Sequence, residues 1–108
     1  GNEEVGAYKS IDMAEAKEIF DKGGDFIILD VRRPGEFAEG HIPGAINVAN
    51  EDIGQEEIAE LPDKKQTIYV YCRSGRRSKE ASAKLVANGY ENIVECGGFN
   101  SWTGEVEK

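Results

Sequence analysis

The sequence predicts an α/β domain built on a mostly parallel sheet. Short runs rich in β-branched and aromatic residues alternate along the chain with segments of helical periodicity, and this alternation is typical of parallel sheets covered by helices. The length of 108 residues and the hydrophobic content of 39% fit one domain with an ordinary core. We expect the domain to span residues 8–103, and the acidic, glycine-containing ends at 1–7 and 104–108 to be flexible.

A helix signal stands near the N-terminus. Asp12 is followed three residues later by Glu15, which is the spacing of a capping box. Apolar residues then recur at helical intervals until Gly23, which ends the helix. The strands that we expect in this half of the chain are 8–11, 26–31 and 45–48, with a break at 33–35 (Arg-Pro-Gly).

The second half of the chain repeats the alternation. The segment Thr-Ile-Tyr-Val-Tyr at 67–71 is the strongest strand signal, because β-branched and aromatic residues favour pleated structure. Residues 78–88 show helical periodicity, and Gly89 closes this helix. The other elements expected here are a weak helix at 53–61, a short strand at 92–95 and a helical turn at 98–102.

Composition and charge exclude several classes of function. The net charge of −8 argues against nucleic acid as a partner, and the longest apolar run, Phe26 to Leu29, is far too short to span a membrane. Two cysteines and one histidine are too few for a disulfide scaffold or a structural zinc site. We therefore expect no metal, no cofactor and no membrane span, and a monomer or weak homodimer.

The sequence leaves the compartment open. The chain begins with Gly1 and Asn2 and carries no Met at this end. We interpret Gly1 as the remnant of a tag, which permits a leader segment that has been removed. The expectation is a cytoplasmic or an extracytoplasmic protein.

The loop around Cys72 is the most informative segment. This cysteine directly follows the predicted strand 67–71, and a helix is expected a few residues later. In parallel sheets, ligands bind beyond the carboxyl ends of the strands. Gly75 allows the loop to curl, and the unpaired N–H groups at the start of the helix would then form an anion-binding nest around the sulfur.

The charge of this loop agrees with its predicted geometry. Between Arg73 and Lys79 there are four basic residues and no acidic one. Cations at a helix N-terminus oppose the helix dipole, so this placement favours a bound anion over a solvated helix start. The same surroundings favour the thiolate form of a cysteine. We therefore expect Cys72 to be a nucleophile that acts on a small anionic substrate.

Four ordered motifs resemble those of single-domain rhodaneses. They are Leu29-Asp30-Val31-Arg32; Glu36-Phe37 with Gly40-His41-Ile42-Pro43-Gly44-Ala45-Ile46-Asn47; Cys72-Arg73-Ser74-Gly75-Arg76-Arg77-Ser78; and Gly97-Gly98-Phe99 with Trp102. The resemblance covers about residues 8–103 and implies a five-stranded, mostly parallel sheet flanked by helices. It also implies sulfur transfer through a persulfide on Cys72, and a substrate loop formed by Arg73, Ser74, Gly75, Arg76, Arg77 and Ser78.

The implied reaction moves a sulfane sulfur from a small anionic donor such as thiosulfate to a thiol, cyanide or protein acceptor. A second hypothesis is a persulfide carrier or redox-sensing module that acts on a partner protein with the same Cys72 chemistry. A third and less favoured hypothesis is a cysteine phosphatase or arsenate reductase. Phosphatase-like loops are one residue longer between the cysteine and its arginine than the segment from Cys72 to Arg77.

Asp30 and Arg32 are candidate supporting residues at the end of the strand 26–31. Asp30 either holds the arginine-rich loop through an ion pair or caps the following turn, and the sequence does not distinguish the two. Arg32 and Glu36 are four positions apart, a spacing that suggests a local pair. His41 is the single histidine, and its turn-rich surroundings favour a hydrogen-bonded turn residue over a general base.

Cys96 stands where the rhodaneses more often have another residue type. A right-handed crossover would lay the strand 92–95 parallel to 67–71. Cys72 and Cys96 would then each lie one residue past a strand end, at the same edge of the sheet. We favour a small buried side chain for Cys96; the alternative is a resolving thiol that forms a reversible disulfide with Cys72.

Overall fold

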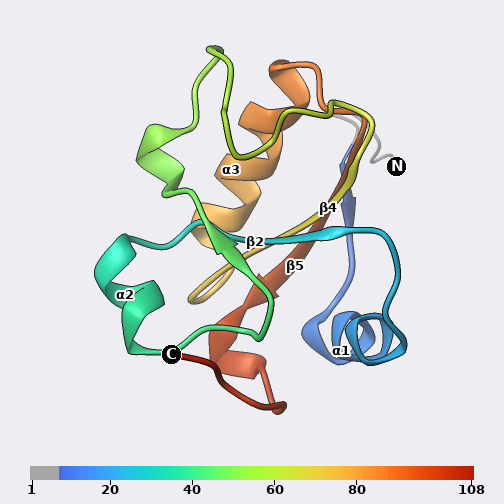
Figure 1. Ribbon diagram of the computed structural model, residues 1–108, viewed down its shortest axis with the longest axis vertical. Helices are drawn as coiled ribbons and strands as arrows, with labels where there is room; N and C mark the ends of the chain where they lie inside the picture. The colour runs from blue at the N-terminus through green and yellow to red at the C-terminus, as the bar shows by residue number, and fades with distance from the viewer. Residues whose placement is uncertain (1–7) are drawn as a thin grey trace.

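Five strands form one parallel sheet in the order β1-β5-β4-β2-β3 (Figure 1). The structure is a computed structural model that describes residues 8–108, so the expectation for residues 1–7 lies outside the described residues. The strands are β1 (Lys9–Ser10), β2 (Ile27–Asp30), β3 (Ile46–Asn47), β4 (Thr67–Cys72) and β5 (Asn92–Gly98). The helices are α1 (Met13–Lys22), α2 (Pro34–Glu39) and α3 (Arg76–Ala87), with 3-10 turns η1 (Asn50–Asp52) and η2 (Phe99–Ser101). The expected α/β fold with a five-stranded parallel sheet is confirmed.

Different helices cover the two faces of the sheet (Figure 1). α3 packs on β4 and β5 and closes a core that includes Val70 and Cys72. α1 lies over the other face, on a second core that includes Tyr71 and Cys96. Because successive side chains of a strand point to opposite faces, Cys72 faces α3 whereas Tyr71 faces α1. Within residues 8–108, no helix combines the length and the apolar content needed to cross a membrane.

The register of the sheet brings Cys72 to the edge where the strands end. Asp30 of β2 pairs with Tyr71 of β4, and Cys72 pairs with Gly98 of β5 after a register shift beyond Val70. Cys72 is therefore the last residue of β4 and not the first residue of the loop. β5 also runs to Gly98 and not to the expected end at residue 95, because its backbone continues to pair with β4.

The first helix begins and ends where the sequence predicts. Oδ1 of Asp12 accepts a hydrogen bond from the N–H of Glu15 at 2.9 Å. At the other end, Gly23 adopts a φ of 77° and donates its N–H to the carbonyl oxygens of Ile19 and Phe20. This left-handed conformation favours glycine, so the helix ends there for a local reason.

A helix occupies the place where the sequence suggested only a break. Pro34 is the first residue of α2, a position at which its missing N–H costs nothing and its fixed φ suits a helix. Oε1 of Glu36 accepts the N–H of Arg33 at 3.0 Å and so satisfies a donor at the helix start. The break expected at 33–35 is confirmed, because β2 ends at Asp30, but the helix that Pro34 starts was not predicted.

The helix expected at 53–61 does not form, and turns follow η1 instead. The side-chain amide of Asn88 donates to the carbonyl oxygens of Gly54 and Glu56 at 2.8 and 3.0 Å. These carbonyl groups are satisfied by a distant side chain in place of helical N–H groups. The apolar residues of the segment that are buried are Ile53, Ile58 and Leu61.

The last residues of the chain are attached to the domain. Glu107 and His41 exchange two backbone hydrogen bonds of 2.8 and 2.9 Å in an antiparallel bridge. Nε1 of Trp102 donates to the carbonyl oxygen of Glu105 at 2.8 Å. These bonds hold the segment 104–108, which the sequence suggested to be flexible, against the body of the protein.

Two serines of α3 test how buried hydroxyl groups affect stability. The hydroxyl of Ser82 is buried without a hydrogen-bond partner among the described residues, whereas that of Ser78 lies 2.6 Å from Oε2 of Glu95. Replacement of Ser82 by Ala should raise the free energy of unfolding by roughly 0.5–1.5 kcal/mol in urea denaturation. The control Ser78→Ala should lower it by about 1–3 kcal/mol, because a buried carboxylate loses a donor. Destabilisation by Ser82→Ala would contradict this view of the core.

Candidate active site

The thiol of Cys72 is fully buried at the end of β4 and is contacted by the loop that follows. The N–H of Gly75 donates to Sγ of Cys72 at 3.0 Å. Gly75 adopts a φ of 111°, a left-handed conformation that other residues rarely take, and it directly precedes α3. The loop therefore curls back toward the sulfur and points a backbone donor at it.

The loop rests directly on the end of β5. A Cβ atom at Gly98 would collide with the carbonyl oxygen of Arg73 and would lie 2.7 Å from Cα of Ser74. The N–H of Asn100 donates to the same carbonyl oxygen of Arg73 at 3.1 Å. Only a residue without a side chain allows this approach, so Gly98 sets the height of the loop above the sheet.

A buried carboxylate supports the loop from below. Oε2 of Glu95 lies 2.6 Å from the hydroxyl of Ser78 and accepts the N–H of Gly97 at 2.8 Å. Oε1 of Glu95 accepts the hydroxyl of Ser10 at 3.3 Å. Sequence reasoning missed Glu95, although a charged residue inside a predicted strand was a signal. Because Ser78 also lies 2.9 Å from the carbonyl oxygen of Gly75, this network connects β5 to the loop.

The three arginines of the loop differ in their partners. Arg77 binds Glu36 of α2 through two nitrogens, at 2.8 and 3.1 Å. Arg76 pairs with Glu80 on the same helix at 3.0 Å. Arg73 is exposed, and within residues 8–108 it forms no ion pair with a carboxylate. The guanidinium group of Arg73 is therefore the one that the described carboxylates leave uncompensated.

A hollow of about 1050 Å³ opens over the loop. Its wall on the α3 side includes Arg73, Ser74 and Arg76, and α2 contributes Glu36 on the opposite side. Cys72 itself is not part of the surface of this hollow, since its side chain is fully buried. The hollow therefore gives a small anion a place beside the loop backbone.

Arg77 and Glu36 influence each other strongly. The hydrogen bonds from Arg77 lower the pKa of Glu36 from its ordinary 4.5 to about 2, against the effect of partial burial. The pKa of Arg77 is raised, chiefly by its hydrogen bonds to Glu36 and in smaller part by the charge of Cys72. The local pair of Glu36 with Arg32 that its spacing suggested does not form.

Asp30 and Arg32 support the neighbouring turn and not the arginine-rich loop. The carboxylate of Asp30 accepts hydrogen bonds from the backbone N–H of Arg32 at 2.9 Å and from its guanidinium group at 2.8 to 3.1 Å. Arg32 also donates to the carbonyl oxygen of Gly40 at 2.7 Å. Of the two alternatives for Asp30, the structure shows the capped turn. Asn47, which sequence reasoning missed, donates to the carbonyl oxygens of both residues.

His41 is a hydrogen-bonded turn residue, as its surroundings indicated. Its Nδ1 lies 2.8 Å from the carbonyl oxygen of Phe37, and its ring stacks on the Phe37 ring with centroids 3.7 Å apart. Its Nε2 lies 3.5 Å from Oε1 of Glu107. Both ring nitrogens thus have partners away from the Cys72 loop.

Cys96 lies on the opposite face of the sheet from Cys72. Cys72 belongs to the core under α3, whereas Cys96 belongs to the core under α1. Burial, with the charge of Glu95, raises the pKa of the Cys96 thiol. The burial expected for Cys96 is confirmed, and the two separate cores do not support the alternative of a resolving thiol that forms a disulfide with Cys72. The expectation failed because Val70, and not Tyr71, pairs with Glu95, so Cys96 shares the face of Tyr71 in the core under α1.

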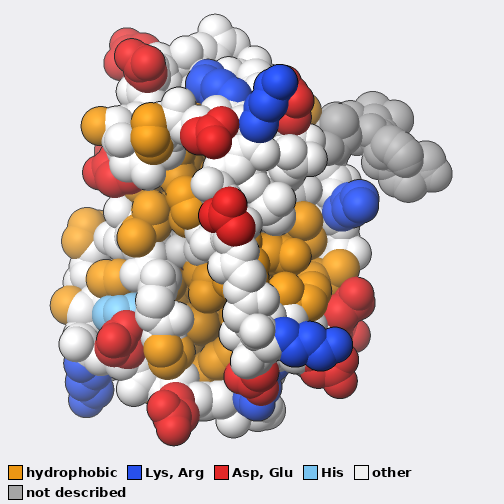
Figure 2. All heavy atoms as spheres, turned by 45° about the vertical axis from the view of Figure 1, so that its right-hand side comes forward, with side chains coloured by type: hydrophobic (Ala, Val, Ile, Leu, Met, Phe, Trp, Pro, Cys, Tyr) orange, Lys and Arg blue, Asp and Glu red, His pale blue; other side chains and the backbone are white. Residues whose placement is uncertain are grey.

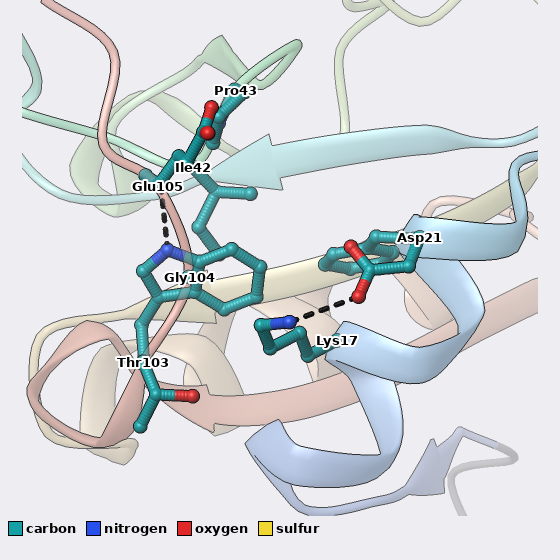
Figure 3. Close-up of a pocket in the computed structure, with 9 residues that line it drawn as sticks. Lys17, Asp21, Ile42, Pro43, Thr103, Gly104 and Glu105 are labelled. Atoms are coloured by element: carbon teal, nitrogen blue, oxygen red, sulfur yellow. Dashed lines mark hydrogen bonds and ion pairs between the residues drawn. The ribbon is translucent and has the colours of Figure 1, made fainter.

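A second hollow, of about 690 Å³, lies on the α1 side of the domain (Figure 3). Phe20 and Trp102 line it, and Lys17 pairs with Asp21 beside them at 2.9 Å. Figure 2, in which this side comes forward, shows apolar side chains at the surface among acidic and basic ones. None of the residues 72–78 lines this hollow, so it takes no part in the chemistry at Cys72.

The pH dependence of stability tests the Glu36–Arg77 pair. Because the pKa of Glu36 falls from 4.5 to about 2 in the folded protein, the unfolded chain binds a proton between these values and the folded protein does not. The stabilisation is complete above about pH 4.5 and is lost as the pH falls toward 2. At pH 7 the free energy of unfolding of the protein, measured by urea denaturation, should exceed that of the Glu36→Gln variant by on the order of 1–3 kcal/mol. A difference that stays constant down to pH 2 would contradict the assignment.

Comparison with known proteins agrees with this geometry. The chain matches the rhodanese-like domain family over residues 12–105. It is 35% identical over 97 residues to the thiosulfate sulfurtransferase GlpE of Pseudoalteromonas translucida, with 89% of this chain and 90% of that protein covered. It is 29% identical over 107 residues to the putative sulfur carrier protein YrkF of Bacillus subtilis, with 98% of this chain and 57% of that protein covered.

A solved structure extends the comparison to the fold. A rhodanese with anions from E. coli superposes with a TM-score of 0.68 at 35% identity, covering 76% of this chain and 96% of that chain. The family match takes in both the Cys72 loop and the Gly97-Gly98 end of β5 that supports it. The chain therefore belongs to the rhodanese-like sulfurtransferase family, as a single α/β domain.

Proposed function

We propose that this protein transfers a sulfane sulfur from a small anionic donor of the thiosulfate type to a thiol or cyanide acceptor, through a persulfide on Cys72. The observation that supports the proposal most is the position of this thiol at the end of β4, with the N–H of Gly75 directed at Sγ from 3.0 Å. The relative from Pseudoalteromonas translucida is a thiosulfate sulfurtransferase, which points to the same class of reaction.

In the first step the Cys72 thiolate attacks the outer sulfur of thiosulfate. A bond forms between Sγ and that sulfur, the S–S bond of thiosulfate breaks, and sulfite leaves with the bonding electron pair. The persulfide carries one negative charge on its outer sulfur. The first N–H groups of a helix have no partners inside the helix, and those of α3 begin beside Cys72, so they are suited to stabilise this charge.

In the second step the acceptor attacks the outer sulfur of the persulfide. A thiolate acceptor gives a new persulfide, and cyanide gives thiocyanate. The bond between the outer sulfur and Sγ breaks, and its electron pair returns to Cys72 as the thiolate. The enzyme thus ends each cycle in the form in which it began.

Replacement of Cys72 by Ser tests the nucleophile. Intact-mass measurement after incubation with thiosulfate should show one added sulfur atom on the wild-type chain and none on Cys72→Ser. Cys96→Ser is the matched control and should still gain the sulfur, because Cys96 lies on the other face of the sheet. Sulfur on the Cys72→Ser variant, or retained transfer to cyanide, would overturn the mechanism.

The loop arginines should contribute unequally to donor affinity. Arg73 lacks a described carboxylate partner, whereas Arg76 is already paired with Glu80. Arg73→Ala should raise the KM for thiosulfate by about two- to five-fold at low salt, and Arg76→Ala by less. The difference should shrink at 0.5 M salt, because exposed charges are screened. Steady-state kinetics with an equal effect of both substitutions would contradict this ranking.

A persulfide carrier that serves a partner protein is the second candidate function. The supporting observation is the relative from Bacillus subtilis, which is a putative sulfur carrier and of which the chain spans 57%. The full burial of Cys72 also restricts which acceptors reach the sulfur. A persulfide that forms on Cys72 but passes to neither cyanide nor small thiols would favour the carrier.

A cysteine phosphatase or arsenate reductase is supported less well. Such an enzyme needs the arginine of its loop to bind the tetrahedral anion. Here Arg77 is bound by both oxygens of Glu36, at 2.8 and 3.1 Å. The guanidinium group would have to leave this partner before it could hold a phosphate.

A further inference from the structure

The pair between Arg77 and Glu36 differs from the other ion pairs around the hollow. Its side chains are 23% and 27% exposed, whereas the exposures are 76% and 48% for Arg76 and Glu80. Water screens a partly buried charge less than an exposed one. Loss of the Glu36 charge should therefore change the potential inside the hollow more than loss of a more exposed carboxylate such as Glu51.

Glu36 also occupies the donor groups that an incoming oxyanion would use. Its two oxygens take two nitrogens of Arg77, the bidentate arrangement in which arginine binds planar oxyanions. Arg77 lies in the first turn of α3, which directly follows the Cys72 loop, and both Arg77 and Glu36 line the hollow over this loop. A donor that enters this hollow thus meets an arginine already paired with a carboxylate.

We propose that Glu36 is a specificity-determining residue that selects sulfur donors by their charge. It disfavours doubly charged donors such as thiosulfate relative to singly charged donors such as an alkyl thiosulfonate. The proposal rests on the proposed sulfur transfer through Cys72. It follows from electrostatics, because the repulsion between Glu36 and a donor is proportional to the charge of the donor.

A thiosulfonate delivers its sulfur by the same bond changes as thiosulfate. The Cys72 thiolate attacks the terminal sulfur of R–SO₂–S⁻, the S–S bond breaks, and the sulfinate R–SO₂⁻ leaves with the electron pair. The product on the protein is the same persulfide. The rates with the two donors can therefore be compared directly, and their ratio cancels effects on Cys72 that are common to both.

The test compares Glu36→Gln with the wild type, using thiosulfate and methanethiosulfonate at low ionic strength. Persulfide formation on Cys72 is followed by rapid-quench intact mass, and kcat/KM is obtained for each donor. If Glu36→Gln raises kcat/KM for the monoanion by about two- to three-fold, it should raise kcat/KM for the dianion by about the square of this factor, roughly four- to nine-fold. The excess for the dianion should fall at 0.5 M salt.

Glu51→Gln is the control matched for net charge. Glu51 also lines the hollow, but it is 54% exposed and pairs with Arg33 at 3.3 Å. This variant should change the ratio of the kcat/KM values for the two donors by less than two-fold. Glu36→Asp keeps the carboxylate and should keep the wild-type ratio.

The outcomes separate this inference from the proposed function. If neither donor places sulfur on wild-type Cys72, the proposed transfer fails. If both donors place sulfur on Cys72, but Glu36→Gln changes kcat/KM for the two donors equally or raises it more for the monoanion, the selection by Glu36 is overturned and the proposed transfer stands. Should Glu36→Gln not fold, as judged by its thermal unfolding, Glu36→Ala removes the same charge and carries the same expectation.

Discussion

The contact between two backbones, that of the Cys72 loop and that of β5, is the constraint on which the site depends. Gly98 has no side chain, so the carbonyl oxygen of Arg73 can lie against it. This approach brings the loop down onto the sheet, where the N–H of Gly75 reaches Sγ at 3.0 Å. The left-handed φ of Gly75 then turns the chain into α3. The chemistry at Cys72 thus requires glycine at two positions for two different reasons, one of space and one of backbone conformation.

Local signals in the sequence were sufficient for the elements that local interactions determine. The cap of α1 involves Asp12 and Glu15, three residues apart, and the strand 67–71 carries its own β-favouring composition. The prediction of a helix at 53–61 was wrong because carbonyl groups of this segment accept hydrogen bonds from Asn88, more than thirty residues away. The prediction of Arg32 as the partner of Glu36 was wrong for the same reason, since the actual partner, Arg77, lies 41 positions further along the chain. The loop itself was predictable in outline, because strand, glycine and helix start are contiguous.

The two cysteines show how strictly a strand assigns side chains to faces. Spacing alone placed both thiols at one edge of the sheet, which made a disulfide geometrically reasonable. In the structure the register shift beyond Val70 pairs Cys72 with Gly98, and Cys96 is an internal residue of β5 that faces α1. A change of one residue along a strand reverses the face to which a side chain points. The pairing of Val70 with Glu95 already gives Cys96 the face of Tyr71, and no pattern in the sequence specifies this register, so the separation of the thiols required the structure.

The electrostatics of the loop come from carboxylates as much as from arginines. The basic residues that follow Cys72 suggested a patch of positive charge alone. In the structure Glu36 pairs with Arg77, and Glu80 pairs with Arg76. Glu95 adds a buried negative charge beneath the loop, held by the hydroxyl of Ser78 and the N–H of Gly97. Among the described arginines of the loop, these carboxylates leave only Arg73 unpaired. The backbone N–H groups, which carry no counter-charge, therefore supply much of the fixed attraction for an anion at the sulfur. The site is therefore better suited to stabilising one negative charge at short range than to attracting strongly charged donors from a distance.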